Sequence, residues 1–390
     1  MKDKFLGYLR EDGRVGIRNH VLVLPASICA SDTTKLIQRK VDGTITFSHQ
    51  LGCSQVGSDS DMTLRTVVGY GAHPNVYGVV IVGLGCENHQ ASLIKKEILK
   101  IVKKPVETVV IQDVGGTVNA VEKGSKIAQK MVEDANKLKR EEFPVSKLIV
   151  ATECGGSDTT SGLASNPTIG KMSDILVEKG ASVVLSETTE FIGAEHILAR
   201  RAKNKEVHDK IYKIVGDFEE HIRKNTGHDV REGNPSVGNQ EGGLTTLEEK
   251  SLGCIHKAGS TTINNVYGYA EHMATGEGLV IMDTPGNDPS SVAGMVAGGA
   301  QIVVFSTGRG TPTGHPIAPV VKVTANRKTW QMMQINLDFD ASGVIYGEKT
   351  MNEQGEELYN RLIEYADGKE TRAEEFGFTE TSIARAANFV

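Results

Sequence analysis

The chain has 390 residues, 39% apolar and 24% charged, and a formal net charge of −6, values that suit a globular protein with two or three domains. The mild negative charge, without a basic stripe among aromatic residues, argues against a nucleic-acid-binding surface. No apolar stretch reaches membrane-spanning length and the N-terminus lacks the apolar core of a signal peptide, so we expect a cytoplasmic protein.

Strands and helices are expected to alternate in the first half of the chain. The first 14 residues are polar and turn-like, and the apolar run at 20–27 then predicts the first strand. A helix should begin near Ser31. Further strands are predicted at 43–47, 75–83 and 106–112, and the apolar spacing of residues 91–104 predicts an amphipathic helix. A long charged helix over 117–142 leads to Pro144, where we expect a domain boundary.

The second half of the chain repeats this alternation. Strands are predicted for the runs LIVAT, ASVVLSET, GLVIMD and QIVVFS and for residues 319–324, with helical stretches between them and a mostly helical tail from Glu353. Strands that alternate with helices favour parallel sheets. We therefore predict an α/β fold of two Rossmann-like, doubly wound domains, residues 1–145 and a larger C-terminal domain of residues 146–390.

The cysteines provide the first candidate site. An odd number of cysteines, five, without a CxxC pair argues against a disulfide framework and a zinc ribbon. Cys53, Cys86 and Cys154 each follow an apolar strand beside a glycine, so their thiols could converge at the carboxyl ends of parallel strands. One interpretation is a thiolate site for iron, or an iron–sulfur cluster with three protein thiolates and one open iron. The alternative is three small buried hydrophobic residues beside turns. Cys29 and Cys254 are expected to be structural.

Charged and polar residues follow the same strand ends. Residues 148–167, LIVATECGGSDTTSGLASNP, place Glu153, Ser157 and Asp158 where a strand gives way to a helix. His49 and His89 stand near Cys53 and Cys86 and could be ligands or proton carriers. His196 follows Glu187 and Glu190, although an isolated histidine is more often a satisfied surface or core residue.

A glycine-rich loop, TGRGTPTGHP, contains Arg309 between Gly308 and Gly310. An arginine in such a loop suits bidentate binding of a carboxylate, and the alternative is a structural turn with an exposed arginine. Neither a phosphate-loop pattern nor a complete GxGxxG fingerprint is present, so a nucleotide ligand is not favoured.

Eight ordered motifs between Gly7 and about Lys369 resemble the altronate/galactarate dehydratase family. They are GYLREDGRVGIRNHVLVLP, HQLGC, AHPNVYGVVIVGLGCE, ECGGSDTTSGLASNPTIG, LSETTEFIGAEH, GGLTTLEEKSLG, MDTPGNDP and VAGGAQIVVFSTGRGTPTG. The resemblance implies dehydration of a sugar acid to a 2-keto-3-deoxy acid with ferrous iron, and a Rossmann variant in the C-terminal part.

The resemblance also implies a partner. Single-chain members begin with a small β-clip domain of the SAF type, whereas this sequence starts directly at the GYLR motif. We therefore expect the large subunit of a two-chain altronate dehydratase, with a small SAF-domain subunit as partner and a homo-oligomeric assembly. Galactarate dehydratase and the large subunit of (2R)-sulfolactate sulfo-lyase are the alternatives. Because we expect the sulfo-lyase branch to lack the thiols of HQLGC and GLGCE, these motifs favour the dehydratase.

A hypothesis for the site combines the residue patterns with this resemblance. Removing the proton next to a carboxylate gives a doubly charged enediolate, which a metal or strong donors must stabilise. Cys53, Cys86 and Cys154 are expected to hold iron, and His49 or His196 is expected to act as the base. Glu153, Glu187 or Asp158 would tune that base. Ser157, Arg309 and the amides of Gly308 and Gly310 are expected to bind the substrate.

Overall fold

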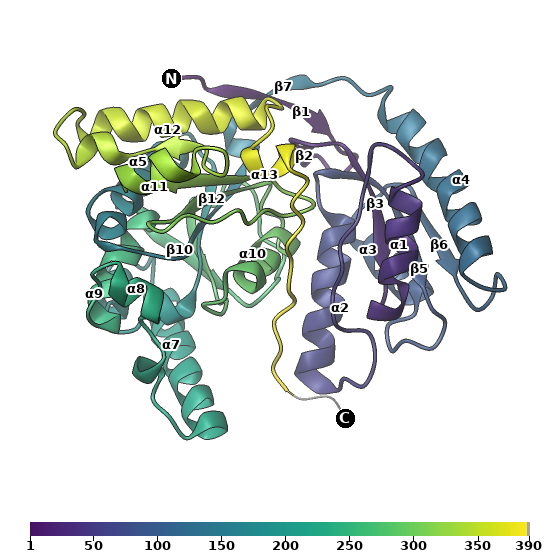
Figure 1. Cartoon of the computed structure of the whole chain (residues 1–390), viewed down its shortest axis with the longest axis horizontal. Coiled ribbons are helices and arrows are strands. Elements are labelled where there is room, and N and C mark those ends of the chain that lie inside the picture. The colour runs from purple at the N-terminus through teal and green to yellow at the C-terminus, as the bar shows by residue number, and fades with distance from the viewer. Residues whose placement is uncertain (388–390) are drawn as a thin grey trace.

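A computed structural model describes residues 1–387 and contains two parallel sheets and one small antiparallel sheet (Figure 1). The smaller parallel sheet has the strand order β4-β3-β5-β6. Its strands are β3 (His20–Pro25), β4 (Thr44–Ile45), β5 (Val76–Gly83) and β6 (Val106–Val110). Helices α1 (Ser31–Gln38) and α4 (Thr117–Ala135) cover one face, and α2 (Gly57–Ala72) and α3 (Ala91–Ile101) cover the other. Helices on both faces of a parallel sheet make this part doubly wound.

The larger parallel sheet has seven strands in the order β10-β11-β9-β8-β12-β13-β14. They are β8 (Ile149–Cys154), β9 (Ser182–Leu185), β10 (Ile263–Tyr267), β11 (Leu279–Met282), β12 (Ile302–Ser306), β13 (Val320–Thr324) and β14 (Phe339–Asp340). Its helices are α5 (Asn166–Glu178), α6 (Glu195–Ala199), α7 (Lys205–Thr226), α8 (Val237–Glu241), α9 (Leu247–Cys254), α10 (Asp288–Ala297), α11 (Arg327–Met333), α12 (Met351–Ala366) and α13 (Arg372–Glu375). The predicted α/β class, with mainly parallel sheets and a larger C-terminal one, is confirmed.

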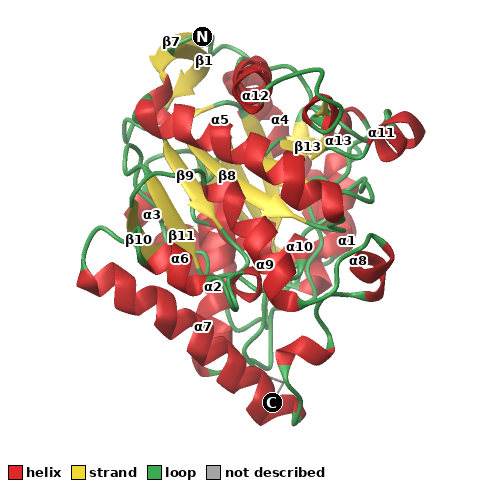
Figure 2. Ribbon diagram, turned by 90° about the vertical axis from the view of Figure 1, so that its left-hand side faces the viewer, coloured by secondary structure: helices red, strands yellow, loops and turns green. Residues whose placement is uncertain are grey.

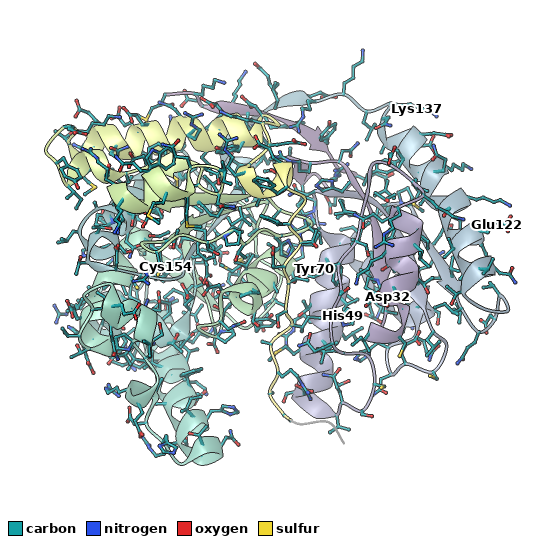
Figure 3. The ribbon with its side chains drawn as sticks, viewed as in Figure 1. Asp32, His49, Tyr70, Glu122, Lys137 and Cys154 are labelled. Carbon is teal, nitrogen blue, oxygen red and sulfur yellow. The ribbon has the colours of Figure 1, made fainter. Side chains whose placement is uncertain are left out.

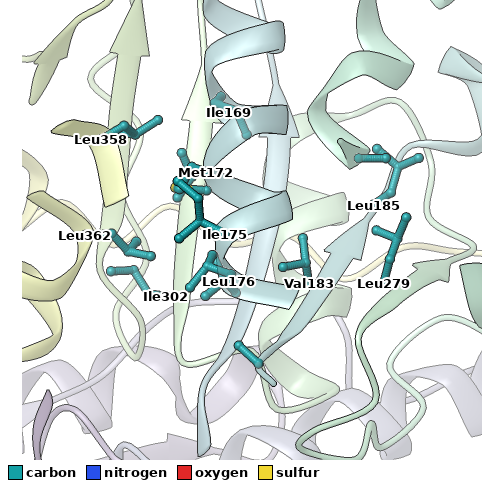
Figure 4. Packing of buried hydrophobic residues seen from close by; sticks show 14 of the residues in the cluster. Ile169, Met172, Ile175, Leu176, Val183, Leu185, Leu279, Ile302, Leu358 and Leu362 are labelled. Carbon is teal, nitrogen blue, oxygen red and sulfur yellow. The ribbon is translucent and has the colours of Figure 1, made fainter. Parts of the chain in front are cut away.

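Helices lie on both faces of the seven-stranded sheet (Figure 2). On one face, α5 packs between the sheet and α12, and its Ile169, Met172 and Leu176 are buried together with Leu358 and Leu362 of α12 (Figure 4). These apolar residues of α5 are spaced three or four apart, which places them along one stripe of the helix. The opposite face is covered by α10, which also contacts α2. One apolar cluster therefore contains residues of both parallel sheets, and the domain division at residues 145 and 146 stays a prediction.

The N-terminal segment forms a strand where the sequence predicts a polar, turn-like stretch. Residues of β1 (Lys4–Leu9) pair in antiparallel fashion with β2 (Val15–Gly16) on one side and β7 (Glu141–Pro144) on the other. Phe5 is buried, whereas its neighbours along the strand are more exposed. This short alternation is easily missed in a sequence, because Leu6 and Leu9 are apolar but exposed, so the apolar residues do not alternate with polar ones. The small sheet lies at the upper edge of the molecule in Figure 1, where it joins the two parallel sheets.

The end of the chain forms a strap between the two parallel sheets (Figure 1). After α13 it runs down to α2, where the carboxylate of Asp59 accepts hydrogen bonds from Arg385 and from the backbone N–H of Ala386. On the way, Thr381 bonds to the hydroxyl of Tyr70 in α2, and Ala384 donates to Tyr269. The strap thus links the smaller sheet to the larger one. None of the helices in residues 1–387 combines the length and the apolar character needed to cross a bilayer.

Candidate functional site

The candidate site lies at the carboxyl edge of the seven-stranded sheet, where β8 and β12 are neighbours. The chain leaves β8 toward β9 on one side, while β12 lies on the other side. Such a switch in strand order opens a crevice in which α/β proteins bind ligands. The two loops at this point are joined, because Gly155 N–H donates to the carbonyl of Ser306 and the N–H groups of Gly308 and Arg309 donate to the carbonyl of Gly156.

Glycine is needed directly after β8. A side chain at Gly155 would place its Cβ 2.0 Å from a carboxylate oxygen of Asp288, so only glycine lets the strand end approach α10 this closely. Gly156 has a φ of 58°, a left-handed conformation that glycine adopts without strain. The sharp turn predicted from the sequence at this point therefore brings the end of β8 against the carboxylate at the start of α10.

A buried group of opposite charges occupies the crevice. The ammonium of Lys257 lies 3.2 Å from a carboxylate oxygen of Glu187 and 3.2 Å from one of Glu190. Lys250 reaches the other oxygen of Glu190 at 2.9 Å. Glu190 also accepts a hydrogen bond from the thiol of Cys154 at 2.9 Å. Burial by itself would raise the pKa of Glu190, but Lys250 and Lys257 outweigh it and hold this pKa below its usual range. Glu190 is therefore ionised and paired with two cations.

A second set of carboxyl groups borders the first. Oxygen atoms of Glu153, Glu187 and Asp288 lie within 4.8 Å of one another. Burial, with the neighbouring charge of Glu187, raises the pKa of Glu153 well above its usual value. Burial and the charge of Glu190 likewise raise the pKa of Glu187 to about 7 and that of Asp288 to about 6. Carboxyl groups that are this close share protons, so Glu187 exchanges a proton near neutral pH.

The backbone of Glu187 is strained. Its φ is 66°, in the left-handed region that residues with a Cβ rarely adopt. The conformation is held by several contacts, because its N–H donates to the hydroxyl of Thr284 and its carboxylate accepts from the N–H of Cys154. Backbone strain that its surroundings enforce is found most often at functional sites.

The thiols of Cys154 and Cys254 lie 3.4 Å apart beneath the charged group, and both cysteines are buried. The hydrogen bond to Cys254, together with burial, raises the pKa of Cys154 well above its usual value, so the Cys154 thiol keeps its proton in the absence of a cation. One atom each of Cys154, Glu190 and Cys254 lies within 4.8 Å of the other two. Two sulfurs and one carboxylate form a donor set that suits a borderline divalent metal ion.

Two cavities open onto this group. The larger one has a volume of about 710 Å³ and is lined by Cys154, Glu187, Glu190, Lys250 and Asp288, together with several residues between 226 and 239. A smaller cavity of about 320 Å³ is lined by Cys254 and shares Lys250 with the larger one. The larger volume is in the range of small-molecule sites, and polar groups converge on it.

Several predicted site residues border these cavities. Ser157 and Asp158 line the smaller one, and the Ser157 hydroxyl lies 3.5 Å from the Cys154 sulfur. Asp158 accepts hydrogen bonds from Asn326 and Thr160, so its carboxylate is held by the fold. Gly308 packs against that carboxylate, since a Cβ there would lie 2.2 Å from its Cγ.

Arg309, predicted to bind the substrate, does not line the two cavities. Its side chain is half-exposed and pairs with Glu241 at 3.1 Å, and neither Arg309 nor Gly310 lines either of the two cavities. A carboxylate-binding role for this loop stays a prediction.

The two histidines predicted as bases do not join the site. In His49 one ring nitrogen bonds to the carbonyl of Pro25 and the other accepts from the N–H of Leu51, so no ring nitrogen is free for a substrate. Burial also lowers the pKa of His49. His196 is half-buried in α6 and lines neither of the two cavities. Of the residues predicted to carry or tune the base, only Glu187 lines the larger cavity.

The three predicted metal-binding thiols are not brought together. Cys154 belongs to the larger sheet, whereas Cys53 and Cys86 are exposed on loops of the smaller one. In Figure 3, Cys154 lies in the left half of the molecule and His49, four residues before Cys53, in the right half. Within residues 1–387 neither Cys53 nor Cys86 belongs to any set of three ligand atoms within 4.8 Å, and the set that contains Cys154 includes neither of them. The physical reason is that each parallel sheet has its own carboxyl edge.

Sequence reasoning missed several residues of the site. Cys254 is buried as expected, but it faces Cys154. Lys250 and Lys257 follow no strand and are not predicted from the sequence, and Asp288 occurs there only within the motif MDTPGNDP, without a role. The spacing of Cys254 and Lys257 is a signal that could have linked them. They stand three residues apart and therefore share one side of a helical segment. Cys29, expected to be structural, is exposed.

Comparisons with known proteins match both parts of the chain. The family described as D-galactarate/Altronate dehydratase, C-terminal, matches residues 145–388, and D-galactarate dehydratase/Altronate hydrolase, second domain, matches residues 7–136. The chain is 38% identical to the (2R)-sulfolactate sulfo-lyase subunit beta of Chromohalobacter salexigens, over 98% of this chain and 97% of that protein. It is 37% identical to the altronate dehydratase of Bacillus subtilis, over 98% of this chain and 78% of that protein. The galactarate dehydratase (L-threo-forming) of Escherichia coli is 33% identical, over 94% of this chain and 73% of that protein.

Proposed function

Because the chain belongs to the D-galactarate/altronate dehydratase family, we propose that it is a lyase that removes water from a sugar acid. The substrate we favour is an aldonate of the altronate type, and the product is a 2-keto-3-deoxy acid. The observation that carries this proposal is the cavity in which Glu187, with a pKa near 7, lies beside the cations Lys250 and Lys257.

Glu187 is the base in this proposal. Dehydration takes the proton from C2, forms a C2=C3 double bond and breaks the C3–O bond, whose oxygen leaves as water after it receives a proton. The enol that remains then becomes the 2-keto acid. A base whose pKa lies near the working pH is best suited to the first step. Glu187 meets this requirement, whereas Glu190 is held in its ionised form by two ammonium groups and is a weak base.

The ammonium groups stabilise charge. When C2 loses its proton, the substrate carboxylate becomes a doubly charged enediolate, which needs positive charge or strong donors nearby. Lys250 lines the larger cavity and is positioned for the substrate carboxylate. Lys257 is buried behind the two glutamates, so we assign it the role of fixing their positions and charge.

The donor set of Cys154, Cys254 and Glu190 fits the ferrous ion that the resemblance implies. Two thiolates and a carboxylate carry three negative charges, and a divalent cation that displaces both thiol protons leaves the net charge of the group unchanged. Held by these three residues, ferrous iron would supply Lewis-acid chemistry for the departure of the hydroxyl. We propose this set in place of the three-thiolate site expected from the sequence.

A substrate screen tests the proposal. Protein purified anaerobically with ferrous iron is incubated with C5 and C6 sugar acids, and the 2-keto-3-deoxy product is measured. We expect turnover by the wild type, loss in Glu187→Gln, and retention in Glu178→Gln, a matched change of an exposed residue at the far end of α5. Absence of turnover with every acid, or full activity in Glu187→Gln, contradicts the proposal.

A second candidate is release of sulfite from (2R)-sulfolactate. The similarity to the sulfo-lyase subunit, 38% identity over 97% of its length, favours it as much as the 37% identity favours altronate dehydration. Both reactions begin with removal of a proton next to a carboxylate, so the same base would serve. A direct sulfite assay beside the keto-acid assay separates the two.

We also propose a small SAF-domain subunit as partner and a homo-oligomeric assembly. Support comes from the sulfo-lyase relative, which is named as a subunit beta. Co-purification of a small chain with the tagged protein, followed by measurement of the mass of the complex, tests both. A monomer that turns over the sugar acid alone contradicts both parts.

A further inference from the structure

Cys29, Cys53 and Cys86 lie on loops at the carboxyl edge of the smaller sheet. Cys29 follows β3, Cys53 follows β4 and Cys86 follows β5. These three strands are neighbours, since the order is β4-β3-β5-β6. Parallel strands end on the same side of a sheet, so their loops share one edge, and β3 and β5 flank the point where the strand order reverses.

Backbone hydrogen bonds tie the three loops together. Ile28, next to Cys29, donates its N–H to the carbonyl of Leu51 at 2.8 Å. Asn88, two residues after Cys86, donates to the carbonyl of Gly52 at 2.9 Å. Gly52 precedes Cys53, so the Cys53 loop is bonded to both of its neighbours. The three thiols therefore belong to one continuous surface built from three adjacent loops.

The loop that carries Cys53 packs closely against the loop that carries Cys29. A Cβ on Gly52 would lie 2.2 Å from the Cβ of Ser27, so the Cys53 loop lies directly against the loop that carries Cys29. Gly52 has a φ of 140° and Ser54 one of 57°, so Cys53 stands between two residues in left-handed conformations. Strain of this kind persists where the surroundings enforce one geometry.

All three thiols are exposed, and within the described chain their sulfurs have no hydrogen-bond partner, in contrast to Cys154. Free cysteines are usually buried, so three exposed thiols on adjoining loops call for a ligand or a function. The same loops also contain buried polar atoms without a partner, namely the hydroxyls of Ser27 and Ser31 and one carboxylate oxygen of Glu87. These residues are 3%, 5% and 4% exposed, so water does not readily satisfy them.

A single metal ion does not fit these thiols. Bonds of about 2.3 Å to a tetrahedral ion would hold its thiolates less than 4.8 Å apart, and residues 1–387 contain no such set at this edge. A cluster of several iron atoms spans a wider triangle of sulfurs. We propose that Cys29, Cys53 and Cys86 bind a [4Fe–4S] cluster with one iron left without a protein ligand. This site is separate from the cavity at β8, and the proposal does not depend on the proposed dehydratase activity.

The free N–H groups of the site suit such a cluster. Neither Cys53 nor Cys86 donates its backbone N–H to another described residue. Inorganic sulfides accept hydrogen bonds from backbone N–H groups, and these bonds adjust the potential of a cluster. The unligated iron would face solvent, where a carboxylate or hydroxyl of a small molecule can bind it.

Reconstitution tests the cluster. The anaerobic protein is incubated with ferrous iron and sulfide and desalted, and its acid-labile sulfide and the electron paramagnetic resonance of the reduced protein are measured. We expect about four sulfides per chain in the wild type, a loss of at least about tenfold in Cys53→Ser and in Cys86→Ser, and no loss in Cys254→Ser. The exposed positions of Cys53 and Cys86 should leave folding intact, which circular dichroism checks.

A second measurement, on the wild-type chain, tests the cluster site without any substitution. After reconstitution, alkylation followed by peptide mass spectrometry should find Cys29, Cys53 and Cys86 protected together, and removal of iron by a chelator should expose all three. The proposal is overturned if the wild type binds no sulfide, if the Cys53 variant keeps it, or if Cys254→Ser loses as much. Because turnover is not measured, failure here leaves the dehydratase proposal standing.

Discussion

Replacing Lys257 with methionine tests the charged group most directly. The Lys257 side chain is 1% exposed, and its ammonium lies 3.2 Å from both Glu187 and Glu190. Removing one member of a buried ion pair leaves unpaired charge and typically costs about 3–5 kcal/mol. Since Glu190 keeps its contact with Lys250 at 2.9 Å, we expect the lower end, a loss of about 3 kcal/mol in the free energy of unfolding. Methionine has nearly the same length as lysine, so little packing is lost.

The stability deficit of Lys257→Met should also change with pH, in a direction that follows from the pKa of Glu187. Lys257 holds the pKa of Glu187 down against burial and the charge of Glu190, so its removal raises this pKa above about 7. A carboxyl group whose pKa is raised in the folded state loses stability as the pH rises through the folded pKa. The deficit of Lys257→Met should therefore be larger at about pH 8 than at about pH 6, where Glu187 is protonated in the variant.

Urea denaturation of the wild type and Lys257→Met at both pH values measures the deficit. Lys126→Met is the matched control, because Lys126 forms an exposed ion pair with Glu122 on α4 and its loss should change little. A Lys257 variant as stable as the wild type, or a deficit that shrinks as the pH rises, would refute the electrostatic account of the site.

Three further outcomes follow from the contacts. In Glu187→Gln the rise of kcat/KM through about pH 7 should disappear and turnover should fall by a factor of about 10² or more; a pH profile with the acidic limb intact would exclude Glu187 as the base. Cobalt(II) should give the absorption of thiolate coordination in the wild type and in Cys53→Ser but not in Cys254→Ser, and absorption in all three proteins would place the metal elsewhere. Asp59→Ala removes the acceptor for Ala386 N–H and for Arg385 and should lower the free energy of unfolding by about 1–3 kcal/mol. Limited proteolysis should then cut the C-terminal strap sooner, and an unchanged cleavage rate would contradict its anchoring role.

The sequence by itself determined the class of the fold and the edge where chemistry is expected. Apolar runs of strand length between amphipathic helices predicted parallel sheets, and the structure has both of them. The turn after Thr152 was also readable, since two glycines follow Glu153 and Cys154. These features are local, because a strand, a helix or a sharp turn depends on residues close together in the chain.

Only the tertiary structure decided which strand ends share an edge. Cys53, Cys86 and Cys154 have the same kind of local surroundings in the sequence, yet two belong to one sheet and one to the other. The partner of Cys154 is Cys254, one hundred residues away on a helix, and spacing alone cannot predict a contact over that distance. The role of Lys257 could not be predicted either. A lysine is usually expected at the surface, and only the folded chain places this one between two carboxylates. Burial and long-range pairing set the charges and pKa values of this site, and both depend on how the elements pack.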